Sequence, residues 1–139
     1  MNTRYETINV FEKDNIFYLE VNRLVELNAL NKTVLDEMLD AIKNIDVSKY
    51  KGAILTGVGE KSFIAGADIT AMSKMTPQET QDFAELGQSV TLAMEDLALP
   101  IIACVHGFAL GGGCEMSLHA DKVQAAAETY IGMVEFGVG

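Results

Sequence analysis

The chain has 139 residues, of which 49% are hydrophobic and 22% charged, and its formal net charge is −10 at pH 7. This length and composition predict one globular domain that can bury a core, and no apolar run is long enough to span a bilayer. The acidic balance argues against non-specific binding to nucleic acid and against binding to an anionic membrane surface.

The first part of the chain predicts a hairpin followed by a helix. Residues 8–11 and 16–21 read as two short strands around the polar turn 12–15. Asn31 is a suitable helix N-cap, and apolar residues then recur at helical spacing, which predicts a helix with one buried face. The members of that face are Val34, Leu35, Met38, Leu39, Ile42 and Ile45.

A buried strand is predicted at residues 52–57, and a turn of small residues follows within residues 63–69. Asp68 can cap the helix start after this turn, which also leaves backbone N–H groups uncovered near Ala67. A tight turn with an ordinary Asp cap explains the same residues, and in isolation that explanation is favoured.

A long helix is predicted from the capping box at residues 76–79 to about Leu99, before Pro100. Gly87 weakens this helix without ending it. We expect its apolar stripe to be core or a subunit contact. The stripe consists of Phe83, Leu86, Val90, Met94 and Leu97.

The stretch 108–115 follows a predicted buried strand at residues 101–105 and opens a helical pattern, so its three glycines are expected at a strand-to-helix junction. Glycines there leave backbone N–H groups able to hold a negative oxygen. Glu115 lies three residues past Gly112 on the same helical face, and a carboxylate beside an N–H donor suits chemistry on a carbonyl. A glycine-rich turn that packs a helix onto a strand, with Glu115 solvated, is favoured on these eight residues alone.

Residues 121–127 predict a further strand, and residues 129–139 close the chain. Two strands and a helix, then alternating strands and helices, predict a mixed α/β fold. His119 and Asp121 could suggest a pair of metal ligands, but we expect His119, like His106, to be structural.

Four motifs stand in order along the chain: residues 27–31, 54–57, 63–69 and 107–115. Together they resemble the crotonase superfamily, most closely the enoyl-CoA hydratases, from residue 8 to the end of the chain. The resemblance implies an α/β fold of the ClpP/crotonase type, a spiral of ββα turns. Family members continue past this point into C-terminal helices. We therefore expect residues 1–139 to be the acyl-CoA-binding catalytic core, truncated before that helical part.

The resemblance also implies an activity, the reversible addition of water to a trans-2-enoyl-CoA to give a 3-hydroxyacyl-CoA. The family's oxyanion hole is formed by two backbone N–H groups, which match Ala67 and Gly112. Its two acid–base glutamates match Glu115 and Glu135, and because isomerases of the family usually keep only the later acid, this pair favours hydration. The alternatives are enoyl-CoA isomerisation, acyl-CoA hydrolysis, or a catalytically silent assembly or interaction fragment.

The coenzyme A site implied by the resemblance surrounds the first small-residue turn. It matches Leu27, Ala65, Asp68, Ile69 and Gly111. The substrate carries coenzyme A, so no metal and no permanently bound cofactor is implied. The resemblance implies a homo-oligomer, a trimer or a dimer of trimers. The negative net charge argues against a nucleic-acid partner.

The expected location is cytoplasmic. Cys104 and Cys114 lie outside any CxxC or Cys/His pattern, which predicts reduced thiols in a reducing compartment. The first residues also lack the apolar core of a secretory signal.

Overall fold

The computed structural model describes residues 5–132 of the chain. Within this range a unit of two strands followed by a helix recurs, as the resemblance implied. The first unit is β1 (Ile8–Lys13), β2 (Ile16–Val21), the short 3₁₀ helix η1 (Leu24–Glu26) and α1 (Lys32–Lys43). The second is β3 (Gly52–Gly57), β4 (Ser62–Ile64), α2 (Ile69–Met72) and α3 (Pro77–Asp96). The third is β5 (Ile101–Val105), β6 (Phe108–Leu110) and α4 (Gly112–Leu118), and the pair β7 (Lys122–Ala125) and β8 (Tyr130–Gly132) follows.

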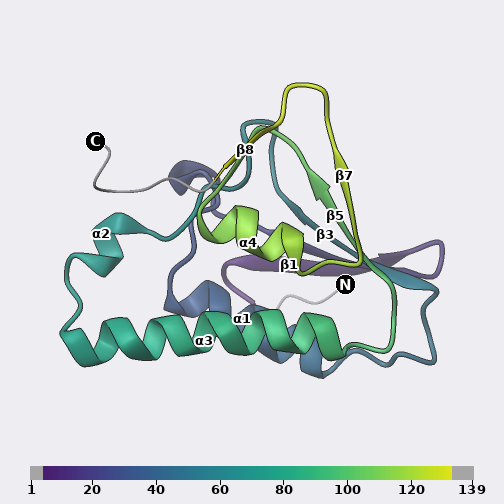
Figure 1. Cartoon of the computed structure of the whole chain (residues 1–139). Helices are drawn as coiled ribbons and strands as arrows, with labels where there is room; N and C mark the ends of the chain where they lie inside the picture. Colours follow the sequence, from purple (N-terminus) through teal and green to yellow (C-terminus); the bar gives the residue numbers. More distant parts are fainter. Residues whose placement is uncertain (1–4, 133–139) are drawn as a thin grey trace.

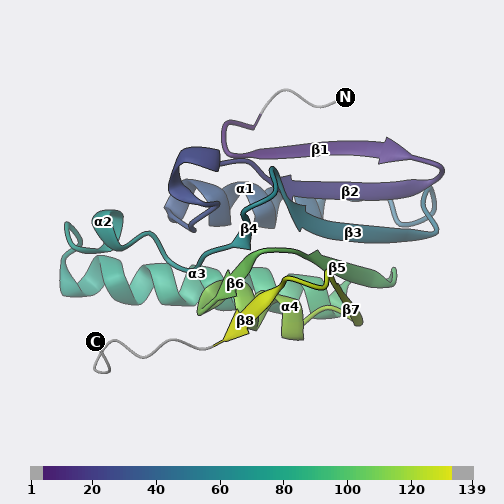
Figure 2. The ribbon, with the colours of Figure 1, turned by 90° about the horizontal axis from the view of Figure 1, so that it is seen from above.

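The strands form two sheets. The larger has the order β1-β2-β3-β5-β7, antiparallel at the hairpin and parallel elsewhere, and the smaller has the order β4-β6-β8, all parallel. Figure 2 shows β1, β2 and β3 side by side, with β6 next to β8. Each later strand pair therefore sends its first strand to the larger sheet and its second strand to the smaller one.

The smaller sheet corrects one expectation from the sequence. The glycine stretch was expected to join the strand at residues 101–105 directly to a helix, but β6 lies between them, so the junction runs from β6 to α4. β4 and β6 have three residues each, too few to show an alternating pattern in the sequence.

The predicted hairpin is confirmed, and its turn is tighter than the polar stretch suggested. Asp14 and Asn15 have φ of 53° and 65°, so the strands extend to Lys13 on one side and Ile16 on the other. Two consecutive positive φ values are typical of the two-residue turns whose twist matches that of paired strands.

Helices α1 and α3 lie side by side against one face of the larger sheet (Figure 1). The predicted buried face of α1 is confirmed, with Leu39 and Ile45 only partly buried at its margin. On α3, Val90 and Met94 are buried, and the rest of the predicted stripe packs half-buried against the core. Gly87 does not interrupt α3.

The predicted helix caps are confirmed, and the predicted end of α3 is not. Asn31 caps α1, and the Thr76–Glu79 capping box is complete. α3 ends at Asp96 because Leu97 is already extended, with φ −66° and ψ 129°. No helix within residues 5–132 is long and apolar enough to cross a membrane.

Candidate active site

Two turns meet at the carboxyl ends of β4 and β6, which are neighbours in the smaller sheet. We call residues 65–68 the first turn and residues 110–113 the second turn. Glycines let them approach closely: a Cβ built on Gly66 would lie 3.1 Å from the carbonyl oxygen of Leu110, and one on Gly111 would lie 4.0 Å from the Cα of Gly66. The structure therefore brings together two turns that are far apart in the sequence.

The first turn is paired with the segment before α1. The Leu30 N–H donates to the Gly66 carbonyl at 2.7 Å, and the Asp68 N–H donates to the Leu30 carbonyl at 2.7 Å. This is a parallel bridge centred on Ala67, so the Ala67 N–H points to the opposite side from Leu30. Among the described residues it has no hydrogen-bond acceptor.

The second turn depends on glycine at two positions, Gly111 and Gly113, which have different requirements. Gly111 has φ 51°, a conformation that L side chains rarely adopt. A Cβ on Gly113 would lie 2.0 Å from the Ile64 carbonyl oxygen, so α4 can start here only without a side chain at that position. Between Gly111 and Gly113, Gly112 begins α4, and its N–H finds no acceptor in the described part of the chain.

Ala67, Gly112 and Glu115 line one hollow of about 250 Å³. The Glu115 side chain rises from the first turn of α4 and is exposed. Two N–H groups without an acceptor among residues 5–132, together with one carboxylate on the same hollow, can bind a carbonyl oxygen and move a proton next to it. Three of the predicted site residues thus come together in the structure.

Helix α3 supplies the opposite wall of this hollow, which the sequence analysis missed. The wall residues are Phe83, Ala84, Gly87, Gln88 and Thr91. The stripe of α3 had been assigned to the core or to a subunit contact, and Phe83 is the stripe member that also lines the hollow. The signal available in the sequence was the pair of small residues, Ala84 and Gly87, which leaves room beside the stripe.

The residues expected to hold coenzyme A do not all border the same space. Ala65 and Asp68 belong to the first turn, Gly111 belongs to the second, and Ile69 follows the first turn and is 60% exposed. Leu27 instead lines a separate hollow of about 300 Å³. That hollow is bordered by η1 and by the β3–β4 loop.

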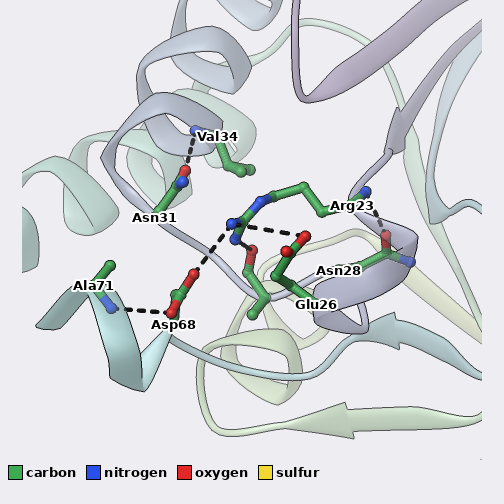
Figure 3. Close-up of polar contacts among 8 residues, drawn as sticks. Arg23, Glu26, Asn28, Asn31, Val34, Asp68 and Ala71 are labelled. Atoms are coloured by element: carbon green, nitrogen blue, oxygen red, sulfur yellow. Dashed lines mark hydrogen bonds and ion pairs between the residues drawn. The ribbon is translucent and has the colours of Figure 1, made fainter.

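Asp68 is the N-cap of α2, as predicted, and its carboxylate is also paired with a basic residue (Figure 3). One oxygen accepts from the Ala71 N–H at 3.0 Å, and the other lies 3.1 Å from Nη2 of Arg23. The Ala71 N–H first, and then the Arg23 guanidinium, lower the pKa of Asp68 below its ordinary value, against the opposing effect of burial.

Glu135, the second predicted acid–base residue, lies outside the described residues. His119 caps the end of α4 and pairs with Glu95 of α3, while Asp121 accepts from the Ile101 N–H at 2.7 Å, so each has a structural partner. Within residues 5–132 no three His, Cys, Asp or Glu side chains lie close enough together to hold a metal ion.

Sequence comparison identifies a protein family that the chain matches. The family model described as "Enoyl-CoA hydratase/isomerase" matches residues 12–139. The chain is 41% identical to the crotonyl-CoA hydratase of Syntrophomonas wolfei over 97% of its length and 52% of the relative's. It is 43% identical to the short-chain-enoyl-CoA hydratase of Clostridium acetobutylicum over 94% of its length and 51% of the relative's. The chain thus spans about half the length of the curated relatives it matches.

Structural comparison agrees with the sequence comparison. The crystal structure of the enoyl-CoA hydratase from Bacillus anthracis superposes with a TM-score of 0.91 at 30% identity, covering 96% of this chain and 53% of the other. The crotonase-type α/β fold expected from the four motifs is therefore confirmed. With the family model matching from within β1 to the last residue, the chain belongs to the enoyl-CoA hydratase/isomerase family.

Proposed function

We propose that this chain carries the acyl-CoA site of an enoyl-CoA hydratase, which adds water reversibly to a trans-2-enoyl-CoA and forms a 3-hydroxyacyl-CoA. The observation that carries the proposal is the meeting of Ala67, Gly112 and Glu115 on one hollow. The printed names of the two relatives, a crotonyl-CoA hydratase and a short-chain-enoyl-CoA hydratase, support a short acyl chain as substrate.

In this proposal the N–H groups of Ala67 and Gly112 donate to the thioester oxygen. Addition of water at C3 turns the thioester into an enolate, and negative charge then collects on that oxygen. The two hydrogen bonds strengthen as the charge develops, so they stabilise the transition state more than the bound substrate. One donor of this kind is worth about 3 kcal/mol by mutational precedent.

Glu115 and Glu135 hold the attacking water between them. One carboxylate takes a proton from the water as its oxygen bonds to C3, and a proton is delivered to C2. The two groups act as a pair, so removing either one slows the same step. Support for Glu115 comes from its place on the hollow, and support for Glu135 comes from the sequence resemblance.

Coenzyme A binds around the first turn, at Ala65, Asp68 and Ile69, with Leu27 and Gly111 as further contacts. The exposed Ile69 side chain and the hollow beside Leu27 offer apolar surface to the adenine end of the substrate. We propose that residues 1–139 form this binding and catalytic core as one domain.

The test is the loss of the enoyl-thioester absorbance of crotonyl-CoA when it is mixed with the chain. Glu115→Gln and Glu135→Gln are each expected to lower turnover by about 100- to 10,000-fold, since each removes a proton-transfer group. Glu128→Gln, an exposed glutamate between β7 and β8, is the matched control and keeps wild-type turnover. Full turnover in Glu115→Gln would exclude hydration by this pair.

Three alternative functions remain, and each has its own result in this assay. The family description includes isomerases, and an isomerase that relies on Glu135 would keep most of its double-bond shift in Glu115→Gln. The chain spans about half of its relatives, and a silent assembly fragment would show no turnover while retaining a folded circular-dichroism spectrum. Hydrolysis of the thioester would release free thiol.

We propose that the protein works as a homo-oligomer, a trimer or a dimer of trimers. Exposed apolar side chains on the last strands support this: Val123, Tyr130 and Ile131 are 38%, 63% and 44% exposed. Sedimentation velocity tests it, and a folded monomer that turns over crotonyl-CoA would contradict it.

The proposed chemistry needs no metal ion and no permanently bound cofactor, because backbone donors and carboxylates supply the required acid–base groups. Dialysis against EDTA is expected to leave turnover unchanged. We also propose a cytoplasmic location, which the free thiols of Cys104 and Cys114 support.

A further inference from the structure

Arg23 does not line the hollow, yet it joins the two segments that hold the first turn. Its Nη1 donates to the Ala29 carbonyl at 2.7 Å, and its Nη2 lies 3.1 Å from Oδ2 of Asp68 (Figure 3). Ala29 directly precedes Leu30, the residue bridged to Ala67. One side chain therefore ties together both sides of the bridge that orients the Ala67 N–H.

This contact is sheltered from solvent. The side chains of Arg23 and Asp68 are each 14% exposed, whereas those of the surface pair Lys32 and Asp36 are 74% and 47% exposed. Exposed ion pairs are weakened by water and by their own mobility. The Arg23–Asp68 pair is also anchored at its far side, because Asp68 caps α2.

The backbone of Arg23 is also held by a hydrogen bond. Its N–H donates to Oδ1 of Asn28 at 2.8 Å, and Nδ2 of Asn28 donates to the carbonyls of Val58 and Ser62 at 3.0 and 2.9 Å. Asn28 is 1% exposed and has φ 59°. The Arg23 side chain therefore starts from a backbone that is itself held in place. Its planar guanidinium contacts the Ala29 carbonyl and the Asp68 carboxylate at the same time, which the single ammonium group of a lysine does not reproduce.

We infer that Arg23 is a positioning residue for the Ala67 donor: its two-point contact with Ala29 and Asp68 sets the orientation of the first turn. The expected effect on catalysis rests on the proposed function. The expected effect on the orientation of the first turn, which is the structural part of the inference, does not. A displaced N–H weakens a hydrogen bond that matters most in the transition state, so kcat falls while KM changes little.

The structural part is tested without ligand, by ¹H–¹⁵N NMR of the 139-residue chain. Arg23→Lys is expected to shift the Ala67 and Asp68 amide resonances, and Arg23→Gln is expected to shift them further. Lys32→Gln, which breaks an ion pair on the adjoining helix, leaves them in place and is the matched control. Wild-type Ala67 and Asp68 resonances in Arg23→Gln would overturn the inference.

The catalytic part is tested by turnover of crotonyl-CoA. Arg23→Gln is expected to lower kcat on the order of 10- to 100-fold, the loss typical of a reacting group misplaced by about 1 Å. Arg23→Lys is expected to recover part of that loss, and in both variants KM stays within about 3-fold of wild type. A wild-type kcat in Arg23→Gln, or a loss seen only in KM, would overturn the positioning role.

The two tests separate failure of the inference from failure of the proposed function. If the wild-type chain does not turn over crotonyl-CoA, the proposed function fails, and the Ala67 resonance still decides whether Arg23 positions the turn. If Arg23→Gln does not fold, Arg23→Lys carries both measurements, because it keeps the charge and most of the side-chain volume.

Discussion

The first and second turns each bring to the hollow a backbone N–H that has no acceptor in the part of the chain that the structure describes, but the two turns are held by different means. Hydrogen bonds from side chains and backbone fix the first turn, through Leu30, Arg23 and Asp68. In the second turn, the lack of side chains allows a helix to start against the backbone of β4. A substitution in a side-chain hydrogen bond weakens that contact gradually. A glycine position with no free space, in contrast, tolerates no larger residue. The two donors should therefore respond very differently to mutation.

The largest loss of stability is expected from Gly113→Ala, in the second turn. The new Cβ would lie 2.0 Å from the Ile64 carbonyl oxygen, which belongs to a strand and cannot turn aside. We expect a loss of at least about 3 kcal/mol in the free energy of unfolding, measured by urea denaturation followed by circular dichroism.

Gly112→Ala is the matched control, one residue earlier. Its Cβ would lie 3.1 Å from Cδ1 of Leu30, the end of a flexible side chain, and alanine favours the helix. We expect the free energy of unfolding of Gly112→Ala to differ from that of the wild type by less than about 1 kcal/mol. Equal losses at Gly112 and Gly113 would show that crowding against the β4 backbone is not what requires glycine.

Asn28→Ala tests the support of the first turn, with a smaller expected effect. The change removes three hydrogen bonds at a residue that is 1% exposed, and it leaves the Val58 and Ser62 carbonyls and the Arg23 N–H without this partner. We expect a loss of about 2–3 kcal/mol in the free energy of unfolding.

Asn44→Ala is its control, because that asparagine makes its side-chain contacts at the exposed end of α1. We expect Asn44→Ala to lower the free energy of unfolding by less than about 1 kcal/mol. A loss at Asn28 no larger than the loss at Asn44 would contradict the role given to the buried amide.

The smallest expected effect is a pH dependence that belongs to the first turn alone. The pKa of Asp68 is lowered from its ordinary value of 3.8, because the Ala71 N–H and Arg23 favour the charged carboxylate. Its contribution to stability is therefore complete above that value and is lost as the pH falls through the lowered pKa.

Urea denaturation of wild type and Asp68→Asn should show this directly. The difference between their free energies of unfolding is expected to be constant near neutral pH and to narrow below about pH 4. A difference that stays constant down to about pH 2.5 would mean that the charge of Asp68 does not stabilise the fold.

Features set by neighbouring residues could be predicted from the sequence. Asn31 and Thr76 cap their helices as expected, because a cap needs only a polar side chain and an N–H two or three residues later. The hairpin and the long α3 follow from patterns that extend over many residues. The four motifs were specific enough to identify the family and the spiral of ββα turns.

Features that join distant segments could not be predicted from local patterns. β4 and β6 are strands because of their neighbours, since three residues contain too little periodicity to show it. The Arg23–Asp68 pair depends on how the first unit packs on the second, and neither residue is unusual where it stands in the sequence. The part of the hollow lined by α3 could not be predicted either, because its residues line a hollow only once the fold brings them opposite Gly112.

The bridge between Leu30 and Ala67 has a consequence for the order in which the protein folds. Leu30 comes from the first ββα unit, Ala67 from the second and Gly112 from the third, so the hollow exists only after three units have docked. Contacts of such large sequence separation form late, because the loops between them must close first. A nascent or partly folded chain therefore presents no pair of donors to a thioester, and ligand binding in a refolding experiment would mark the final step.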